Sequence, residues 1–307
     1  MADLVHININ DGANGITATV KRDGKMRTYV RTFDSVAAYI KHNEQTPTDA
    51  DAALHHASIT RGDKSRGRDW LGVETVAQVR AAVTTGWAEG AEKIRGAFDE
   101  VKNVPVPKSL RRKPVRGDMG DELCPHAILR GDFSHAWTRK TRQTAQGKRT
   151  VQLVANILDN ATHSASELFW RGAATLKLAV MLVEAGYAVE IYAGLAINFH
   201  FKNHSNTWNL VDLIKVKTAN APLDIQNLAG VIGLSGFARY YGFMGIINAA
   251  IECAGDAADG GLGSAIGLDV ALLDQGDRFV TPRCNTAQDA EKWIRDTLAD
   301  IEGEVKL

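Results

Sequence analysis

Cysteines are few in this sequence, and long hydrophobic runs are missing. The 307 residues include three cysteines, Cys124, Cys253 and Cys284, and no CxxC pair. So few thiols cannot build a disulfide scaffold and are typical of a reducing compartment. Apolar runs end well before the roughly 18 residues of a membrane span. The N-terminus also lacks the basic and then apolar pattern of a signal peptide. We therefore expect a cytoplasmic protein without a membrane segment.

The common catalytic motifs are also missing. The sequence contains no GxSxG, GxxxxGK[ST] or HExxH, so it has no nucleophile elbow, phosphate-binding loop or zinc-protease helix. The glycine-rich turn at 260–263 does not lie between a clear strand and a helix. No pair of carboxylates stands out from the ordinary acidic surface. These absences predict a protein that is not an enzyme and holds no cofactor and no metal.

The first 103 residues predict an α+β N-terminal part. Residues 4–33 alternate in polarity around the turn sequences DGANG and RDGK, which indicates a β-meander. Two helices are expected over residues 73–101, with a break near Gly86. Residues 104–150 contain four of the seven prolines, three of them in VPVPKSLRRKPVR, and the segment shows no apolar periodicity. They are predicted to be a basic linker or long loop.

Residues 151–307 predict a three-layer α/β domain. The apolar run VQLVANIL (151–158) is typical of a buried parallel strand. A long helix follows, with Ser164 as N-cap, Glu167 at capping-box spacing and Gly186 at its end. Two long strands joined by KNHSN then predict an antiparallel hairpin, and an amphipathic helix closes the sequence. Strands that alternate with helices favour this architecture.

The run VQLVANILDNATHS and the helix RGAATLKLAVMLVEAG resemble a divergent von Willebrand factor A domain. That family holds a divalent cation with a DxSxS loop after its first strand, through hard oxygen ligands. The aligned residues here are Asp159, Ala161 and His163. Two of the three ligands are missing, so we expect the metal site to be degenerate. The resemblance implies an alternative function as a protein–protein adaptor.

The whole chain is also similar to uncharacterised proteins of tailed phages and bacteria. The residues that carry this similarity are Trp70-Leu71-Gly72 and Gly86-Trp87-Ala88-Glu89-Gly90. The chain further resembles single-stranded-DNA-binding transcription regulators of podophages that carry a virion RNA polymerase. This resemblance implies single-stranded DNA and RNA polymerase as partners, and the cytoplasm of the host as the location.

Positive charge is concentrated in the middle of the chain. Residues 101–150 hold 12 Lys or Arg and 4 Asp or Glu, whereas residues 151–307 hold 11 and 18. Clustered cations neutralise phosphates, and aromatic rings among them can stack on unpaired bases. The predicted nucleic-acid-binding residues are Lys108, Arg111, Arg112, Lys113, Arg116, Arg139, Lys140, Arg142, Lys148 and Arg149 for the backbone, and Trp70, Phe133 and Trp137 for stacking.

Two interpretations of this basic segment stay open. It can bind single-stranded nucleic acid without strong sequence preference, as an accessory protein in phage transcription or replication. It can instead pair with the acidic C-terminal half of the same chain or with an acidic protein partner. A homo-oligomer is expected in the first case, because weak sites on several subunits add through multivalency.

Overall fold

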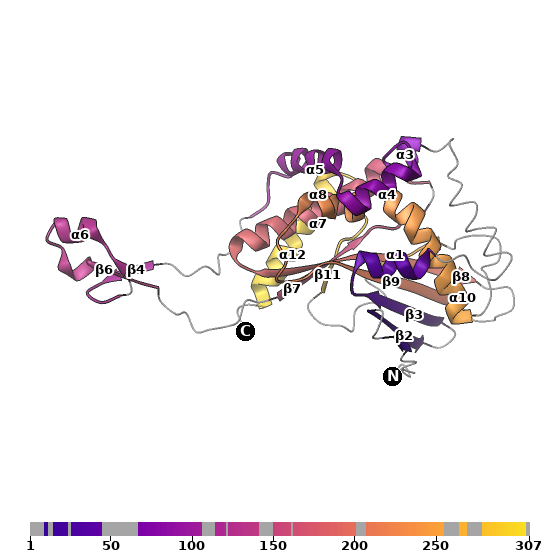
Figure 1. Ribbon diagram of the computed structural model, residues 1–307, viewed down its shortest axis with the longest axis horizontal. Coiled ribbons are helices and arrows are strands. Elements are labelled where there is room, and N and C mark those ends of the chain that lie inside the picture. The colour runs from indigo at the N-terminus through magenta and orange to yellow at the C-terminus, as the bar shows by residue number, and fades with distance from the viewer. Residues whose placement is uncertain are drawn as a thin grey trace.

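The protein has a mixed α/β fold, which confirms the α/β part of the predicted fold class. The computed structural model describes residues 9–11, 15–23, 26–44, 67–105, 114–120, 122–140, 150–160, 162–200, 207–254, 264–268 and 278–304. Its centre is one twisted sheet (Figure 1). The strand order is β1 (Ile9–Asp11), β2 (Ile16–Asp23), β3 (Met26–Phe33), β9 (Thr207–Lys217), β8 (Ala188–His200), β7 (Thr150–Asn156) and β11 (Arg278–Val280), with β10 (Ser264–Ala265) on the end of β8.

This sheet joins the two ends of the chain. The β2–β3 hairpin comes from the first 33 residues, and β3 pairs in parallel with β9 over eight residues from Met26↔Thr207 to Phe33↔Ile214. The predicted boundaries at residues 103 and 150 therefore do not separate two sheets. The β8–β9 hairpin is antiparallel, as predicted, and β7 pairs in parallel with both β8 and β11.

Apart from the helix within residues 114–140, the described helices pack on one face of the sheet. Val151, Leu153 and Ala155 of β7 lie in the larger hydrophobic cluster, together with core residues of α3 (Gly67–Leu71), of α9 (Ser235–Phe237) and of seven other helices. These are α1 (Val36–Asn43), α4 (Val76–Thr85), α5 (Ala88–Glu100), α7 (Ala165–Ala185), α8 (Ile225–Leu228), α10 (Phe243–Ala254) and α12 (Ala287–Glu304). The opposite face carries a smaller cluster, which includes Val154 and Leu268 and no described helix. The second helical layer of a three-layer sandwich is thus not among the described residues.

Local sequence signals place the long helices where they were predicted. Ser164 and Glu167 form a capping box at the start of α7, and Gly186 ends this helix with a φ of 98°. Gly86 separates α4 from α5 with a φ of 87°, a conformation that favours glycine. The Oγ1 of Thr286 accepts a hydrogen bond from the backbone N–H of Asp289 at the start of α12.

A segment of very close backbone packing lies between α8 and α10. It contains two π-helical turns, η2 (Ala229–Gly233) and η3 (Ala238–Gly242), and the short helix α9 (Ser235–Phe237). Leu234 is extended between η2 and α9 and interrupts the helical run. Gly172 of α7 approaches η2 so closely that a Cβ there would lie 2.1 Å from the carbonyl oxygen of Ile232.

Residues 114–140 fold into a small unit instead of the predicted linker. Three short strands, β4 (Pro114–Gly117), β6 (Trp137–Lys140) and β5 (Glu122–Leu123), pair in that order. The helix α6 (Pro125–Leu129) and the 3-10 turn η1 (Phe133–His135) connect β5 to β6. Figure 1 shows this small sheet unit apart from the main body. Across the described parts of the chain, we find no helix that is long and apolar enough to cross a membrane.

The contact between Gly172 and Ile232 predicts a stability effect. Gly172→Ala should lower the free energy of unfolding by about 1–3 kcal/mol, because the backbone of η2 must move to admit the methyl group. Gly96→Ala on α5 is the matched control. It meets nothing within 4 Å and should stabilise the protein by up to about 1 kcal/mol. Urea denaturation measures both, and equal stability of the two variants would contradict the packing.

Candidate functional site

The small sheet unit brings together three of the predicted nucleic-acid-binding side chains. Arg116 lies opposite Thr138, and Trp137 lies opposite Gly117 and Leu123. Cross-strand partners share a face of a sheet and successive residues alternate. Arg116 and Trp137 therefore lie on opposite faces, a separation that the linear sequence did not reveal. The side chain of Phe133, which begins η1, is 68% exposed.

The charge of the segment lies beside this unit and not within it. Residues 114–140 hold four Lys or Arg and four Asp or Glu, so the formal charge of the unit is zero. The positive excess comes from the flanking residues 101–113 and 141–150, which hold five and three cations and no carboxylate. Outside the described residues lie Lys108, Arg111, Arg112, Lys113, Arg142, Lys148 and Arg149, and also the side chains of Arg139 and Lys140.

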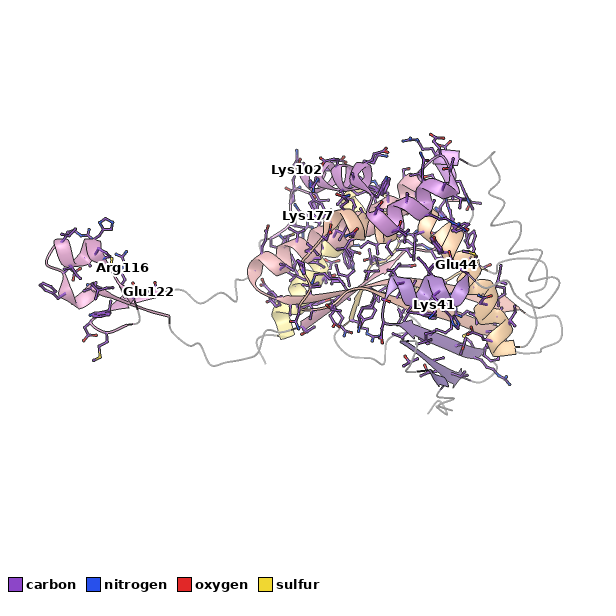
Figure 2. The ribbon with its side chains drawn as sticks, viewed as in Figure 1. Lys41, Glu44, Lys102, Arg116, Glu122 and Lys177 are labelled. Carbon is purple, nitrogen blue, oxygen red and sulfur yellow. The ribbon has the colours of Figure 1, made fainter. Side chains whose placement is uncertain are left out.

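Strand pairing places the attachment points of the two basic flanks at one end of the unit. Pro114 begins β4, Lys140 ends β6, and these two residues are register partners. The basic run that ends at Lys113 is bonded to the first, and the run that begins at Thr141 is bonded to the second. Two clusters that are about 30 residues apart in sequence thus start from adjacent strand ends. Figure 2 shows Arg116 and Glu122 on this unit, far from Lys41 and Glu44 of the main body.

The structure does not bring Trp70 to this surface. Trp70 lies in the short helix α3 (Gly67–Leu71), which packs on α9 and α7. The guanidinium carbon of Arg239 lies 3.7 Å from the centre of its ring, and the Oγ of Ser235 donates to its carbonyl oxygen at 2.9 Å. A base that stacked on the Trp70 ring, as predicted, would have to compete with the guanidinium of Arg239. Trp70 therefore lies apart from Phe133 and Trp137.

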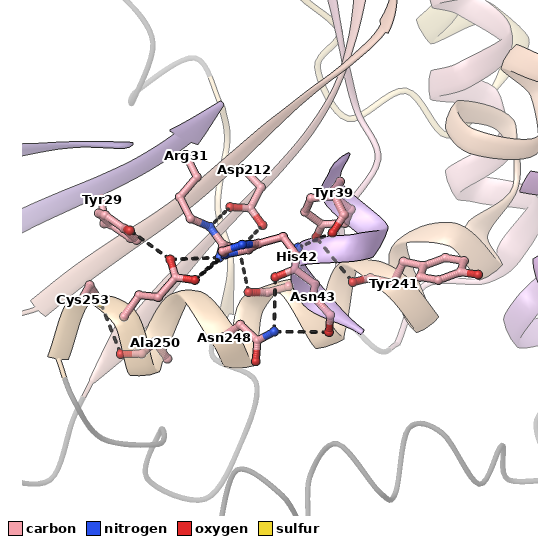
Figure 3. A network of polar contacts seen from close by, with 12 residues as sticks. Tyr29, Arg31, Tyr39, His42, Asn43, Asp212, Tyr241, Asn248, Ala250 and Cys253 are labelled. Carbon is pink, nitrogen blue, oxygen red and sulfur yellow. Dashed lines mark hydrogen bonds and ion pairs between the residues drawn. The ribbon is translucent and has the colours of Figure 1, made fainter. Parts of the chain in front are cut away.

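A buried polar network on the main body was not predicted from the sequence (Figure 3). The guanidinium of Arg31, 1% exposed, donates to both carboxylate oxygens of Asp212 at 2.7 Å and to the Gly245 carbonyl at 2.7 Å. Its third contact is Glu252, at 3.1 Å, and Glu252 also lies 2.6 Å from a ring nitrogen of His42. All of these groups have partners, so the network is suited to holding elements together.

The surroundings of Glu252 set its ionisation. Burial alone would raise the pKa of this carboxyl, but the hydrogen bond with His42 and the charge of Arg31 outweigh it. Together they lower the pKa of Glu252 to about 2. Burial and the same carboxylate also raise the pKa of the Tyr29 hydroxyl, which donates to Glu252 at 3.0 Å. Glu252 is thus an anion at neutral pH that bridges β3, α1 and α10.

A second buried ion pair lies after β7, in the loop where a metal site was considered. The Asp159 carboxylate contacts the guanidinium of Arg171, and both side chains are fully buried. His163 and Arg283 approach the same carboxylate at 3.7 and 3.5 Å. Burial would raise the pKa of Asp159, and the hydrogen bond with Arg171 lowers it overall. The carboxylate is therefore already neutralised by protein cations.

The described residues offer little for metal or thiol chemistry. They contain no group of three or more His, Cys, Asp or Glu side chains placed to hold a metal ion. Ala161 of the predicted loop lies outside them. Burial raises the pKa of Cys253 and of Cys284 to about 12, so both are protonated thiols at neutral pH and poor nucleophiles.

The Glu252 network predicts a pH dependence of stability. Its folded pKa is depressed, so its contribution is complete above the unfolded value of about 4.3 and is lost as the pH falls toward about 2. Glu252→Gln should remove on the order of 1 kcal/mol at pH 7, since the group is partly solvated. The difference from wild type should shrink below about pH 4. Thermal unfolding between pH 7 and pH 3 tests this, with the exposed Glu44→Gln as control.

The Asp159–Arg171 pair predicts that loss of the carboxylate lowers the free energy of unfolding strongly, with or without a metal ion. Asp159→Asn leaves the buried guanidinium of Arg171 without its carboxylate and should cost about 3–5 kcal/mol. Asp296→Asn on the exposed face of α12 should change stability by less than about 0.5 kcal/mol. Millimolar Mg²⁺ should leave the melting temperature of the wild type unchanged. A rise in that temperature on addition of Mg²⁺ would show that the Asp159 carboxylate binds the metal ion in preference to the guanidinium of Arg171.

Comparison with known proteins identifies the family of the chain. A family model described as "Domain of unknown function (DUF7192)" matches residues 12–304. No curated protein and no solved structure gives a significant match. The match includes the N-terminal hairpin, the small sheet unit and the C-terminal helix, and so covers nearly the whole fold. The chain belongs to the DUF7192 family.

Proposed function

We propose that the protein is a non-enzymatic accessory protein that binds single-stranded nucleic acid without strong sequence preference, in phage transcription or replication. One observation carries this proposal. The two basic runs that flank the unit, residues 108–113 and 142–149, are joined to paired strand ends, at Pro114 and Lys140. A single polyanion can therefore contact both segments, and phosphate neutralisation is the main source of non-specific affinity.

The aromatic residues of the small sheet unit would supply the second part of the interface. Phe133 is largely exposed, so its ring can stack on an unpaired base. Trp137 is half-buried on β6, so part of its side chain is open to solvent. Base stacking tolerates any sequence, because every base has a π-face. This combination favours single strands over duplexes, whose bases are already stacked.

The second candidate is a protein–protein adaptor built on a von Willebrand A-like domain in the C-terminal half. The observation that favours it is the ion pair at Asp159, where Arg171 supplies a positive charge to the carboxylate of the degenerate metal loop. In this function the loop would be a fixed surface, and the basic segment would recognise an acidic protein such as a polymerase subunit. Host cytoplasm is the location in both proposals.

A titration of a fluorescein-labelled single strand, followed by anisotropy, tests the first proposal. Raising the salt from about 50 to about 200 mM should weaken binding steeply. Arg111→Glu, Arg112→Glu and Lys113→Glu together should weaken it at least about tenfold for every sequence and lower the salt slope by about 2. Lys41→Glu with Lys292→Glu, on exposed faces of α1 and α12, is the control for net charge and should have a small effect.

Phe133→Ala separates stacking from charge. It should cost about 1–3 kcal/mol of binding and leave the salt slope unchanged. Lack of binding at low salt overturns the proposal. Binding that does not depend on salt, or that survives the triple reversal, shows that the basic flanks are not the contact surface. Capture of an acidic protein without any oligonucleotide affinity would favour the adaptor.

A further inference from the structure

A cleft of about 440 Å³ lies at the carboxyl ends of two parallel strands, β3 and β9. Its walls are the turn from β3 into α1, the last residues of β9, and the chain from Thr218 to Leu228 that leads into α8. In α/β sheets, ligands bind preferentially outside the carboxyl ends of parallel strands. The volume is also within the range of small-molecule sites. The cleft therefore has the position and the size of a binding site, although none of the predicted site residues belongs to it.

A β-bulge near the end of β9 sets the direction of Lys217. Ile191 of β8 pairs with Lys217. The next residue, Tyr192, pairs with Lys215, so Val216 is an extra residue on β9. Because cross-strand partners share a face, Lys217 lies with Ile191 on the helical face of the sheet. Regular alternation would have placed it beside Lys215 on the opposite face. Bulges next to sites often redirect a side chain in this way.

The ammonium of Lys217 is buried without a counter-ion. The residue is 5% exposed, and its Nζ donates to the carbonyl oxygens of Val189 at 2.7 Å and Thr218 at 3.0 Å. Within the described part of the chain, no carboxylate forms an ion pair with it. Burial lowers the pKa of Lys217, and the charge of Glu190 offsets this only in part, because that carboxylate accepts from Gln152 at 2.8 Å. An ammonium has three donors, so one N–H remains for a ligand.

The other charged residues that line the cleft have their charges engaged elsewhere. Lys215 lies over an aromatic ring on the opposite face of the sheet, with its Nζ 5.6 Å from the ring centre. Asp224 caps α8 and accepts hydrogen bonds from two backbone N–H groups of that helix. The exposed carboxylate of Asp34 lies beside Gly15, in the turn before β2. A buried charge normally requires a partner of opposite sign, and for Lys217 the described chain supplies none.

The start of α1, on another wall of the cleft, offers backbone donors. Its first turn contains no acidic side chain, although a negative charge would be favourable there. The Oγ of Ser35 accepts the N–H of Ala38 at 3.1 Å. The N–H groups of Val36 and Ala37 have no partner within the helix, and no other described group accepts from them. Both residues line the cleft.

We propose that this cleft binds a small organic anion, whose carboxylate or phosphate group is the counter-ion of Lys217. The first N–H groups of α1 are further donors for such a group. Most of the remaining lining is apolar, so the ligand carries a short apolar body; the apolar lining residues are Val36, Ala37, Val216, Ala221, Pro222 and Leu228. The proposal does not rest on nucleic-acid binding, because the basic flanks belong to residues 101–150 and the cleft does not. The two can fail separately.

Thermal unfolding of the full chain with hexanoate tests the proposal, at an ionic strength held constant with sodium chloride. The melting temperature of the wild type should rise and saturate, by about 2–3 °C at about ten times the dissociation constant. Hexanamide has the same apolar chain without the charge and should give no rise. Acetate and inorganic phosphate separate the two possible groups, because the one that matches the site gives the larger rise.

Lys217→Met removes the charge, keeps a long side chain and should abolish the rise with hexanoate. Lys215→Met is the matched control on the opposite face and should retain it. Ala37→Glu gives the cleft a carboxylate of its own and should also abolish the rise, whereas the uncharged Ala37→Gln should not. The readout is the rise on adding the anion, so a change in the stability of a free variant does not affect it.

The absence of a rise with every anion overturns the proposal. So does a rise that hexanamide produces equally, or one that Lys217→Met retains in full. If Lys217→Met does not fold, the comparison of Ala37→Glu with Ala37→Gln decides the result, because neither substitution removes the lysine. Equal responses of these two variants to hexanoate would then contradict an anion site in the cleft.

Discussion

The buried pair of Arg31 and Asp212 fixes how the two ends of the chain form one sheet. These residues are direct register partners on β3 and β9, and the guanidinium contacts both carboxylate oxygens at 2.7 Å. Side chains alternate along a strand, so a slip of one residue would turn Arg31 to the opposite face and leave a buried charge without a partner. Such a cost discriminates strongly against other registers, even if the pair adds little net stability.

The same guanidinium also positions two helices. Through Glu252 and the Gly245 carbonyl it contacts α10, and Glu252 in turn contacts His42 of α1. The T-shaped contact of Phe33 with Tyr39, with ring centres 4.9 Å apart, completes the attachment of α1 to β3. The N-terminal hairpin, its following helix and the C-terminal sheet therefore share one anchor. The family match from residue 12 to residue 304 agrees with a fold in which both ends are required.

Local signals explain which parts of this fold could be predicted. The capping box of α7, the break at Gly86 and the β8–β9 hairpin depend on residues that are close in sequence. The pairing of β3 with β9 joins residues 181 positions apart, and no local pattern encodes it. Arg31 itself looks like an ordinary exposed position in an alternating strand. For that reason the sequence suggested two separate parts where the structure has a shared sheet.

The candidate site shows the same limit. Counting charges located the basic clusters, but the strands of the unit between them have only two to four residues, too few to show a periodicity. In the sequence, the cations nearest to Trp70 are Lys64, Arg66 and Arg68, just before it. In the structure, the cation over its ring is Arg239, 169 residues away. Neighbours in sequence were a poor guide to which cation an aromatic ring meets.

The arrangement of residues 101–150 separates two chemical properties, positive charge and exposed apolar surface. Charge acts over roughly a Debye length and requires no fixed geometry, so it can be carried by flanking segments of any exact conformation. Apolar contact acts only on direct approach and needs the side chains to be held in place, as the folded strands hold Leu123 beside Trp137. Because the two properties belong to different residues, salt screens the charge of the flanks, whereas a substitution of Leu123 alters only the folded strands.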